Sequence, residues 1–328
     1  MSAQPHLLTE LVQFAERGPR GLTELAERFL LEVPLQRAES LKRPAEAATP
    51  GSRSTTSFEH LDLLDLPRLR ATGDGRVFFL SAGAVAGRGA DCQVRLDVDS
   101  EALSKQHARF DVAGAAWSLT DLGSKNGTFV DRRQVRGKGS EPLSSFAVVQ
   151  LGDVRLVFLE PEDLHAILAP VQPAAETTVR ALRVELEGLG SRRFLVRYGS
   201  GHFLLIDPHG KERDRRKAEV FLPTQAHVLA GDGPYVIGRS RSCEITIKAR
   251  MVSKQHARVV RQPGRSGWWL EELGSKFGTE VNGERLAAGR PIRLMEWDGF
   301  TLGQRAARGQ FLDPRGLLEY LSEEAEGR

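Results

Sequence analysis

The first 33 residues of the chain carry apolar side chains at the spacing of a helix. These positions form two groups, which are separated by Gly18-Pro19 and followed by Pro34. They are Leu7, Leu8, Leu11, Val12 and Ala15, and then Leu22, Leu25, Ala26, Phe29 and Leu30. The spacing predicts two amphipathic helices that form a helical hairpin over residues 1–41. Because so short a hairpin is not stable alone, we expect it to dock on a neighbouring domain, on a second copy of the chain or on a partner.

From residue 58 onward the pattern changes to short apolar runs separated by turn residues. In the first half of the chain the runs lie at residues 77–80, 94–96, 107–112, 117–120, 148–151 and 154–159. Many short strands with close turns indicate an antiparallel β-sandwich. A segment that begins at Pro161 then predicts a short closing helix, because proline is preorganised for the first helical turn. We assign residues 58–170 to this domain.

Three short motifs of this domain recur in the same order about 150 residues later, which indicates a duplicated structural unit. The first copy is Gly87-Arg88, Ser104-Lys105-Gln106-His107 and Gly123-Ser124-Lys125-Asn126-Gly127-Thr128. The second copy is Gly238-Arg239, Ser253-Lys254-Gln255-His256 and Gly274-Ser275-Lys276-Phe277-Gly278-Thr279. A second proline-led helical segment begins at Pro314. The predicted fold class is therefore mainly β, with two antiparallel sandwiches that each end in a short C-terminal helix.

Two segments without periodic apolar residues, 42–57 and 171–178, are predicted to be linkers, the first of them flexible. The second domain would then span residues 179–328 and begin with a β extension over residues 179–217. Its strand-like runs lie at residues 182–186, 194–198 and 203–206. Since the first repeat lacks such runs, they predict an added hairpin or a small extra module. Residues 211–217 are basic, which favours a solvated loop over a phosphate or nucleic-acid contact.

The order Gly-Arg, Ser-x-x-His and Gly-Ser-x-Asn-Gly-Thr resembles the motifs of the forkhead-associated (FHA) family, whose members bind phosphothreonine. The resemblance implies that Arg88 makes the primary phosphate contact, that Ser104 donates its hydroxyl hydrogen and that Lys105 adds charge. Lys125 falls where many family members have a threonine that touches the phosphate. Asn126 matches an asparagine that hydrogen-bonds the backbone of the bound peptide.

The second repeat keeps the residues that the resemblance assigns to the phosphate. They are Arg239, Ser253, Lys254 and Lys276. Phe277 replaces Asn126, so we expect a second pocket with an altered or weaker peptide preference, the alternative being a structural or phospho-independent role. The resemblance implies structural roles for the remaining motif residues. These are Gly87, His107, Gly127, Gly238, His256 and Gly278.

Composition and charge narrow the range of functions. The 46 basic and 43 acidic residues leave a net charge of only +3, so nucleic-acid binding is not expected despite a pI of about 9.0. No apolar run has the length of a bilayer and no signal peptide is evident, so we expect a cytoplasmic protein without a membrane contact. Cys92 and Cys243 are predicted to be buried thiols. No metal-ligand, nucleotide-binding or catalytic motif is evident, so no metal, cofactor or enzyme activity is expected.

A threonine pair precedes each predicted sandwich, Thr55-Thr56 before the first and Thr177-Thr178 before the second. The pairs resemble the phosphorylated Glu-Thr-Thr segment ahead of the FHA domain in actinobacterial regulators of glutamate metabolism. The resemblance implies an intramolecular phospho-tail that competes with partners for the binding site. The alternative is a Ser/Thr-rich linker without such a role.

These observations predict a tandem FHA protein of bacterial type that acts as a non-enzymatic adaptor. Its expected partners are threonine-phosphorylated proteins and a Ser/Thr kinase that modifies them. Two linked sites would bind a doubly phosphorylated partner more tightly than either site alone. The alternatives are a phospho-independent interaction scaffold and a nucleic-acid-binding protein.

Overall fold

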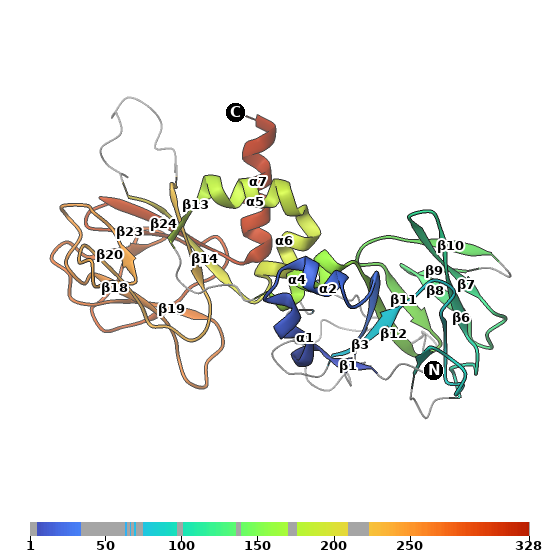
Figure 1. The fold of residues 1–328 in the computed structure, drawn as a ribbon. Coiled ribbons are helices and arrows are strands. Elements are labelled where there is room, and N and C mark those ends of the chain that lie inside the picture. The colour runs from blue at the N-terminus through green and yellow to red at the C-terminus, as the bar shows by residue number, and fades with distance from the viewer. Residues whose placement is uncertain are drawn as a thin grey trace. The chain divides into compact units, whose positions relative to one another are not determined.

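The computed structural model describes residues 5–33, 63, 66, 69, 75–96, 101–135, 139–169, 176–208 and 223–327. The chain divides into two compact units, residues 1–169 and 170–328 (Figure 1). The predicted linker 42–57, the threonine pair Thr55-Thr56 and the basic segment 211–217 lie outside the described residues. None of the helices in the described part of the chain is long and apolar enough to cross a membrane.

The first unit is a β-sandwich with helices at both ends of its sequence. Its described strands form a seven-stranded sheet, β1-β3-β2-β12-β11-β8-β9, and a five-stranded sheet, β10-β7-β6-β4-β5. The strands are β1 (His6–Leu7), β2 (Arg28–Val33), β3 (Arg76–Leu80), β4 (Val85–Gly87), β5 (Val94–Arg95), β6 (Ala108–Ala113), β7 (Ala116–Asp121), β8 (Thr128–Val130), β9 (Arg133–Gln134), β10 (Ser140–Leu143), β11 (Val148–Leu151) and β12 (Val154–Leu159). The helices are α1 (Leu8–Ala15), α2 (Pro19–Thr23) and α4 (Pro161–Leu168).

The second unit repeats this arrangement strand for strand. Its described strands form the sheets β13-β15-β14-β24-β23-β20-β21 and β17-β16-β18-β19-β22. The strands are β13 (Glu176–Thr178), β14 (His202–Asp207), β15 (Gln225–Leu229), β16 (Tyr235–Gly238), β17 (Ile245–Thr246), β18 (Ala257–Arg261), β19 (Trp268–Glu272), β20 (Thr279–Val281), β21 (Glu284–Arg285), β22 (Ile292–Arg293), β23 (Gly299–Leu302) and β24 (Ala307–Leu312). The helices are α5 (Val179–Leu189), α6 (Ser191–Tyr198) and α7 (Pro314–Gly327).

The predicted fold class is confirmed, including the closing helices α4 and α7 that begin at Pro161 and Pro314. All strand pairs are antiparallel in the described part except β4 with β5 and β16 with β17, which are parallel. Apolar side chains from both sheets fill the space between them, because alternate residues of each strand point inward. In the first unit the largest of these are Phe78, Phe110, Trp117 and Phe158.

Helices cover the other face of the larger sheet, so its central strands are buried on both sides. In β14, Leu204 and Ile206 belong to the core between the sheets. Phe203 and Leu205, which alternate with them, pack in a second cluster with residues of α5, α6 and α7. Strands buried on both faces have continuous apolar runs rather than an alternating pattern.

The second helix predicted for the N-terminal segment of the first unit is wrong in part. The reason is that a strand buried on both faces has a continuous apolar run. Helix α2 ends at Thr23, and residues 28–33 form strand β2 between β3 and β12. Phe29, Leu30 and Leu31 are all fully buried. A short apolar run is compatible with a helix or a doubly covered strand, and here pairing with two neighbours decides for the strand. The first domain therefore includes residues that precede position 58.

The predicted β extension at the front of the second domain is also corrected. Residues 182–186 and 194–198 lie in helices α5 and α6, and only 203–206 lie in a strand. Val179 and Leu182 are buried, whereas Val184 is 62% exposed, which is the pattern of a helix face. The prediction that the first unit lacks this segment is wrong as well. Helices α1 and α2 and strand β2 of the first unit are the counterparts of α5, α6 and β14.

Candidate functional site

The motif residues lie on loops that leave the ends of β4, β5 and β7. Arg88 follows β4, and its Nε donates a hydrogen bond of 2.7 Å to the carbonyl oxygen of Leu103. Its backbone N–H donates to the carbonyl oxygen of Ser104 at 3.1 Å. The exposed guanidinium has no other hydrogen-bond partner among the described residues. Arg88 is thus fixed through Nε, and its two terminal nitrogens make no hydrogen bond among the described residues.

Gly87 permits the close approach that this arrangement requires. A Cβ atom built at Gly87 would overlap the carbonyl oxygen of Lys105, and one at Gly238 would overlap that of Lys254. Any other residue would therefore push the arginine loop away from the serine loop. The thiols of Cys92 and Cys243 donate to the same two carbonyl oxygens, at 3.0 and 3.1 Å. Both cysteines are buried and free, as predicted, and burial raises the pKa of each thiol.

His107 links the serine loop to the loop that carries Lys125 and Asn126. Its Nδ1 accepts a hydrogen bond from the backbone N–H of Ser104 at 3.1 Å, and its Nε2 lies 3.1 Å from the carbonyl oxygen of Gly127. Since Nδ1 accepts, the ring is neutral and Nε2 donates. The side chain is fully buried, and burial lowers the pKa of His107.

His256 makes the same two contacts in the second unit, each at 3.0 Å. It joins Ser253 to Gly278 and is also fully buried. Burial lowers the pKa of this histidine as well. The neutral rings cannot serve as cations for an anionic ligand, and their contacts are those of loop-bracing groups.

Each motif serine presents its hydroxyl between the two loops. The Ser104 Oγ accepts a hydrogen bond of 3.1 Å from the backbone N–H of Lys125, and Ser253 Oγ accepts one of 3.1 Å from Lys276. Because the oxygen accepts, the hydroxyl hydrogen remains available to an acceptor such as a phosphate oxygen. The ammonium groups of Lys105 and Lys125 belong to exposed side chains on the same two loops.

Asn126 and Phe277 give the two sites different surfaces. The Asn126 amide nitrogen donates to the carbonyl oxygen of Ala102 at 2.9 Å, which leaves its amide oxygen as an acceptor for a ligand. In the second unit the Lys276 ammonium lies 5.3 Å from the centre of the Phe277 ring. Such a distance is typical of a cation–π contact, which holds the lysine charge over the aromatic face.

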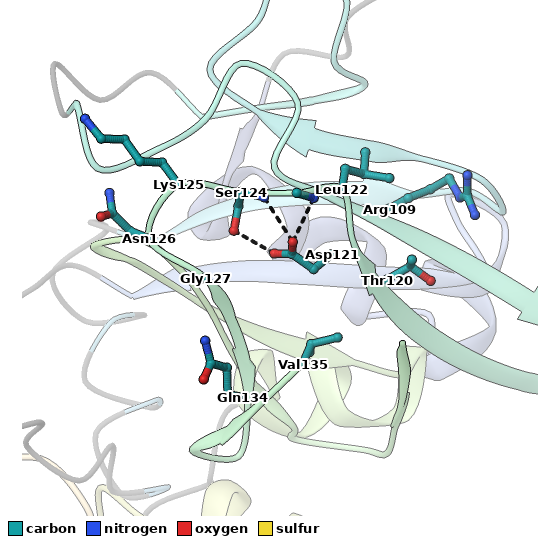
Figure 2. Close-up of a pocket in the computed structure, with 11 residues that line it drawn as sticks. Arg109, Thr120, Asp121, Leu122, Ser124, Lys125, Asn126, Gly127, Gln134 and Val135 are labelled. Atoms are coloured by element: carbon teal, nitrogen blue, oxygen red, sulfur yellow. Dashed lines mark hydrogen bonds between the residues drawn. The ribbon is translucent and has the colours of Figure 1, made fainter. Parts of the chain in front are cut away.

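Asp121 shapes the loop that carries Lys125 and Asn126, a role that the sequence motif did not indicate. Its carboxylate accepts from the backbone N–H groups of Gly123 at 2.8 Å and Ser124 at 3.0 Å, and from the hydroxyl group of Ser124 (Figure 2). It also accepts from the hydroxyl group of Thr128. Burial raises the pKa of Asp121, but these hydrogen bonds outweigh it and the pKa is lowered. An aspartate two residues before a glycine is a turn signal that could have identified it.

A hollow of about 830 Å³ adjoins this loop. Lys125 and Asn126 lie at one end and Arg109 at the other, with Gln134 and Val135 beneath (Figure 2). The Arg109 guanidinium is bonded to Asp111, with Nε to Oδ1 at 2.7 Å. None of Arg109, Gln134 and Val135 was predicted from the sequence to be a site residue, although Arg109 ends the repeated block that contains His107. No cluster of metal-ligating side chains occurs in the part of the chain that the structure describes.

Thr177 and Thr178 occupy an ordered position rather than a linker. Both lie in β13, which pairs with β15, and the Thr178 hydroxyl accepts a hydrogen bond of 3.1 Å from the backbone N–H of Ala181. Thr178 is thus the N-cap of α5. The predicted linker 171–178 ends before Glu176, because residues 176–178 complete an edge of the larger sheet.

Comparison with known proteins gives the same family twice in the chain. The FHA domain model matches residues 84–152 and 235–303. The glycogen accumulation regulator GarA of Mycolicibacterium smegmatis is 35% identical over 120 residues, which are 36% of this chain and 73% of that protein. The oxoglutarate dehydrogenase inhibitor of Corynebacterium diphtheriae is 40% identical over 75 residues, which are 23% of this chain and about half, 49%, of that protein.

Several solved structures that the chain matches are described as FHA domains. One, described as an analysis of phosphothreonine-dependent FHA domain interactions, is 32% identical and has a TM-score of 0.24. The match covers 26% of this chain and 86% of that one. The motifs, the duplicated sandwich, the family model and the curated relatives agree, and the chain belongs to the FHA domain family.

Proposed function

We propose that the chain is a non-enzymatic adaptor whose two FHA domains bind threonine-phosphorylated proteins. The observation that carries this proposal is the repeated set of groups around Arg88 and Arg239. Each arginine is anchored through Nε, to Leu103 O at 2.7 Å and to Val252 O at 3.2 Å, so its terminal N–H groups remain for a ligand. A serine hydroxyl and exposed lysines lie on the neighbouring loops of each unit.

These groups suit a phosphate chemically. A phosphothreonine carries a charge of about −1.5 to −2 and three acceptor oxygens. An arginine with two free terminal nitrogens can donate two parallel hydrogen bonds to it, which is the strong, charge-assisted geometry. The serine hydroxyl supplies a further donor, and Lys105 and Lys254 supply charge. The set thus provides hydrogen-bond donors and positive charge around one point, which supports binding of an anionic group.

The proposed partners are proteins phosphorylated on threonine by a Ser/Thr kinase. Two sites in one chain raise the effective concentration of a second phosphothreonine once the first is bound. GarA is named as a regulator and the Corynebacterium diphtheriae protein as an inhibitor, which supports a regulatory role for such binding. Self-binding through a phosphorylated threonine remains part of the proposal for Thr55 and Thr56. At Thr177 and Thr178 modification would first have to open β13 and the start of α5.

Capture of phosphorylated proteins from a lysate should depend on both arginines. The double variant Arg88→Ala/Arg239→Ala should lose these proteins, and phosphatase treatment of the lysate should abolish capture by the unmodified chain. Quantitative mass spectrometry of the captured proteins measures both effects. Arg20→Ala, which removes an exposed arginine of helix α2, is the matched control and should capture the same set. Equal capture by the double variant would instead support a phospho-independent scaffold.

The two sites should differ in which peptide sequences they prefer, whereas both should require the phosphate. Phe277→Asn restores the amide that Asn126 provides in the first unit, so it should strengthen phosphopeptide binding at the second site by about three- to tenfold. Titration of the chain carrying Arg88→Ala, which leaves only the second site, measures this gain. A loss of affinity would show that the Phe277 ring is itself a ligand contact.

A further inference from the structure

The loops around the two arginines differ strongly in charge. From Arg88 to Lys105 the chain has three basic and four acidic residues. From Arg239 to Lys254 it has five basic residues and one acidic residue. The described parts of the two segments belong to equivalent elements of a duplicated fold, so different architecture does not account for the charge differences among the described residues.

One reversal of charge occurs at a position that the backbone contacts make equivalent. The arginine Nε bonds place Leu103 of the first unit in the position of Val252 in the second. Counting back two residues from each of these gives Glu101 and Arg250. Both side chains are exposed. We call the exposed residues of the loops around each arginine the rim of that site. At this position the rim of the first site has a carboxylate, whereas the rim of the second site has a guanidinium.

The loop after the arginine shows a second contrast. Cys92 and Cys243 hold equivalent positions, because each thiol donates to the carbonyl oxygen of the motif lysine. The residue before each cysteine is Asp91 in the first unit and a serine in the second. One residue earlier the first unit has an alanine, whereas the second has the exposed Arg241. The side chain of Asp91 accepts from Gln106, and it remains an exposed carboxylate.

The acidic residue of the second segment lies away from the rim. Glu244 Oε2 accepts a hydrogen bond of 2.9 Å from the backbone N–H of Val236 near the start of β16, whereas Arg239 follows the end of that strand. Three residues of extended strand separate the two positions by about 10 Å, which is about one Debye length. On strand β5 the charge difference is reversed. Arg95 of the first unit is basic, whereas the corresponding residue of the second unit, Thr246 on β17, is neutral. The contrast is thus confined to the loops.

From this pattern we infer that the second site selects phosphothreonine segments whose neighbouring residues carry additional negative charge, whereas the first site does not. The inference rests on the proposed phosphothreonine-binding function. Additional charge means aspartate, glutamate or a second phosphate close to the phosphothreonine. Arg241, Lys248 and Arg250, all exposed, would attract such residues across the short distances that a bound peptide spans. Glu101 and Asp91 would repel them at the first site.

The test uses the full chain with one site disabled at a time. Arg88→Ala leaves the second site and Arg239→Ala leaves the first. Fluorescence polarisation is measured with phosphothreonine peptides that share a sequence core but have acidic, neutral or basic flanks, and with a peptide that has a second phosphate. The unphosphorylated acidic peptide is included. The readout is the ratio of affinities for acidic and basic flanks.

We expect the acidic-to-basic ratio to be at least about tenfold higher at the second site than at the first, since several exposed charges each contribute a few-fold. Arg250→Glu should lower the ratio about fivefold at the second site, and the reciprocal Glu101→Arg should raise it at the first. Both effects should diminish between about 0.05 M and about 0.5 M salt. The doubly phosphorylated peptide distinguishes a second phosphate from carboxylates as the better flank.

Two different failures are separable. Equal ratios at both sites, with phosphate dependence intact, would overturn the charge selectivity and leave the proposed function standing. Loss of the distinction between phosphorylated and unphosphorylated peptides at both sites would overturn the proposed function itself. A ratio that does not respond to Arg250→Glu and Glu101→Arg would show that these rim residues do not select the flanks. Circular dichroism confirms that each variant is folded.

Discussion

Replacing Arg88 with alanine should weaken phosphothreonine binding at the first site at least about thirtyfold, or about 2 kcal/mol. The side chain is exposed and makes one described side-chain contact, from Nε to Leu103. Its removal therefore has little effect on the core but leaves the phosphate without its bidentate donor. Isothermal titration of the chain carrying Arg239→Ala, with and without Arg88→Ala, measures the loss.

The matched control for this measurement is Arg88→Lys. Lysine retains the positive charge but presents a single ammonium rather than a planar pair of donors. We expect an intermediate loss, so that the series separates charge from geometry. Affinity within twofold of the parent for Arg88→Ala, in a chain that is folded, would mean that the phosphate is bound elsewhere.

Acidification should destabilise the second unit through His227. The side chain is 1% exposed in the core between the sheets, and neither ring nitrogen has a hydrogen-bond partner among the described residues. Burial lowers the pKa of His227 to about 4. The unfolded chain takes up this proton near the ordinary pKa of about 6.5, so it binds more protons than the folded chain between these values. Stability is therefore retained above about pH 6.5 and falls progressively toward pH 4, by about 3 kcal/mol at most.

The first unit supplies the matched variant for this prediction. Leu204 on β14 and Leu30 on β2 hold equivalent positions in the two units. Leu204 pairs with His227 and Leu30 pairs with Phe78, so Phe78 is the core residue equivalent to His227. His227→Phe should flatten the loss of stability on acidification, and Phe78→His should introduce the same sensitivity into the first unit. Thermal denaturation at about pH 7.5 and about pH 5 separates packing from titration. Equal pH dependence in the parent and His227→Phe would contradict the assignment.

A second histidine adds to the acid sensitivity of this core. His202 stacks on Phe311 with ring centres 5.3 Å apart, and its Nδ1 has no hydrogen-bond partner among the described residues. Burial and the charge of Arg261 lower the pKa of His202 to about 4. His227→Phe should therefore remove part of the acid response of the second unit and leave the part that His202 contributes.

Short contiguous motifs carry the candidate site, and for that reason it could be predicted from the sequence. Arg88, Ser104, Lys125 and Asn126 lie in blocks whose loop geometry is local, and their repetition as Arg239 and its neighbours excluded coincidence. The alternation of short apolar runs likewise sufficed for the sandwich, because alternate residues of a strand face opposite sides of a sheet. These properties depend on neighbouring residues in the chain.

The secondary structure of the N-terminal part of each unit depended instead on contacts between residues far apart in the sequence. Residues 28–33 form a strand because β3 and β12 pair with them on either side, and Val184 is exposed because α5 turns it away from α6 and α7. The runs in question are too short for their period to distinguish helix from strand. The structural equivalence of residues 6–33 and 176–207 was hidden for the same reason, since the two segments share an architecture but no sequence motif.

Side-chain chemistry around the loops was also decided by the tertiary structure. The contacts that join the Ser104 hydroxyl to the backbone of Lys125 and the Arg88 guanidinium to Leu103 bridge loops that are separate in the sequence. The hydrogen bonds of Asp121 and Thr178 are local, by contrast, and turn and helix-start signals could have indicated them. The opposition of Glu101 and Arg250 became visible once the arginine contacts aligned loops of unequal length. The sequence determines which chemical groups the chain contains. How deeply each group is buried, which group it contacts and which charges lie near it follow from the way that separate segments pack.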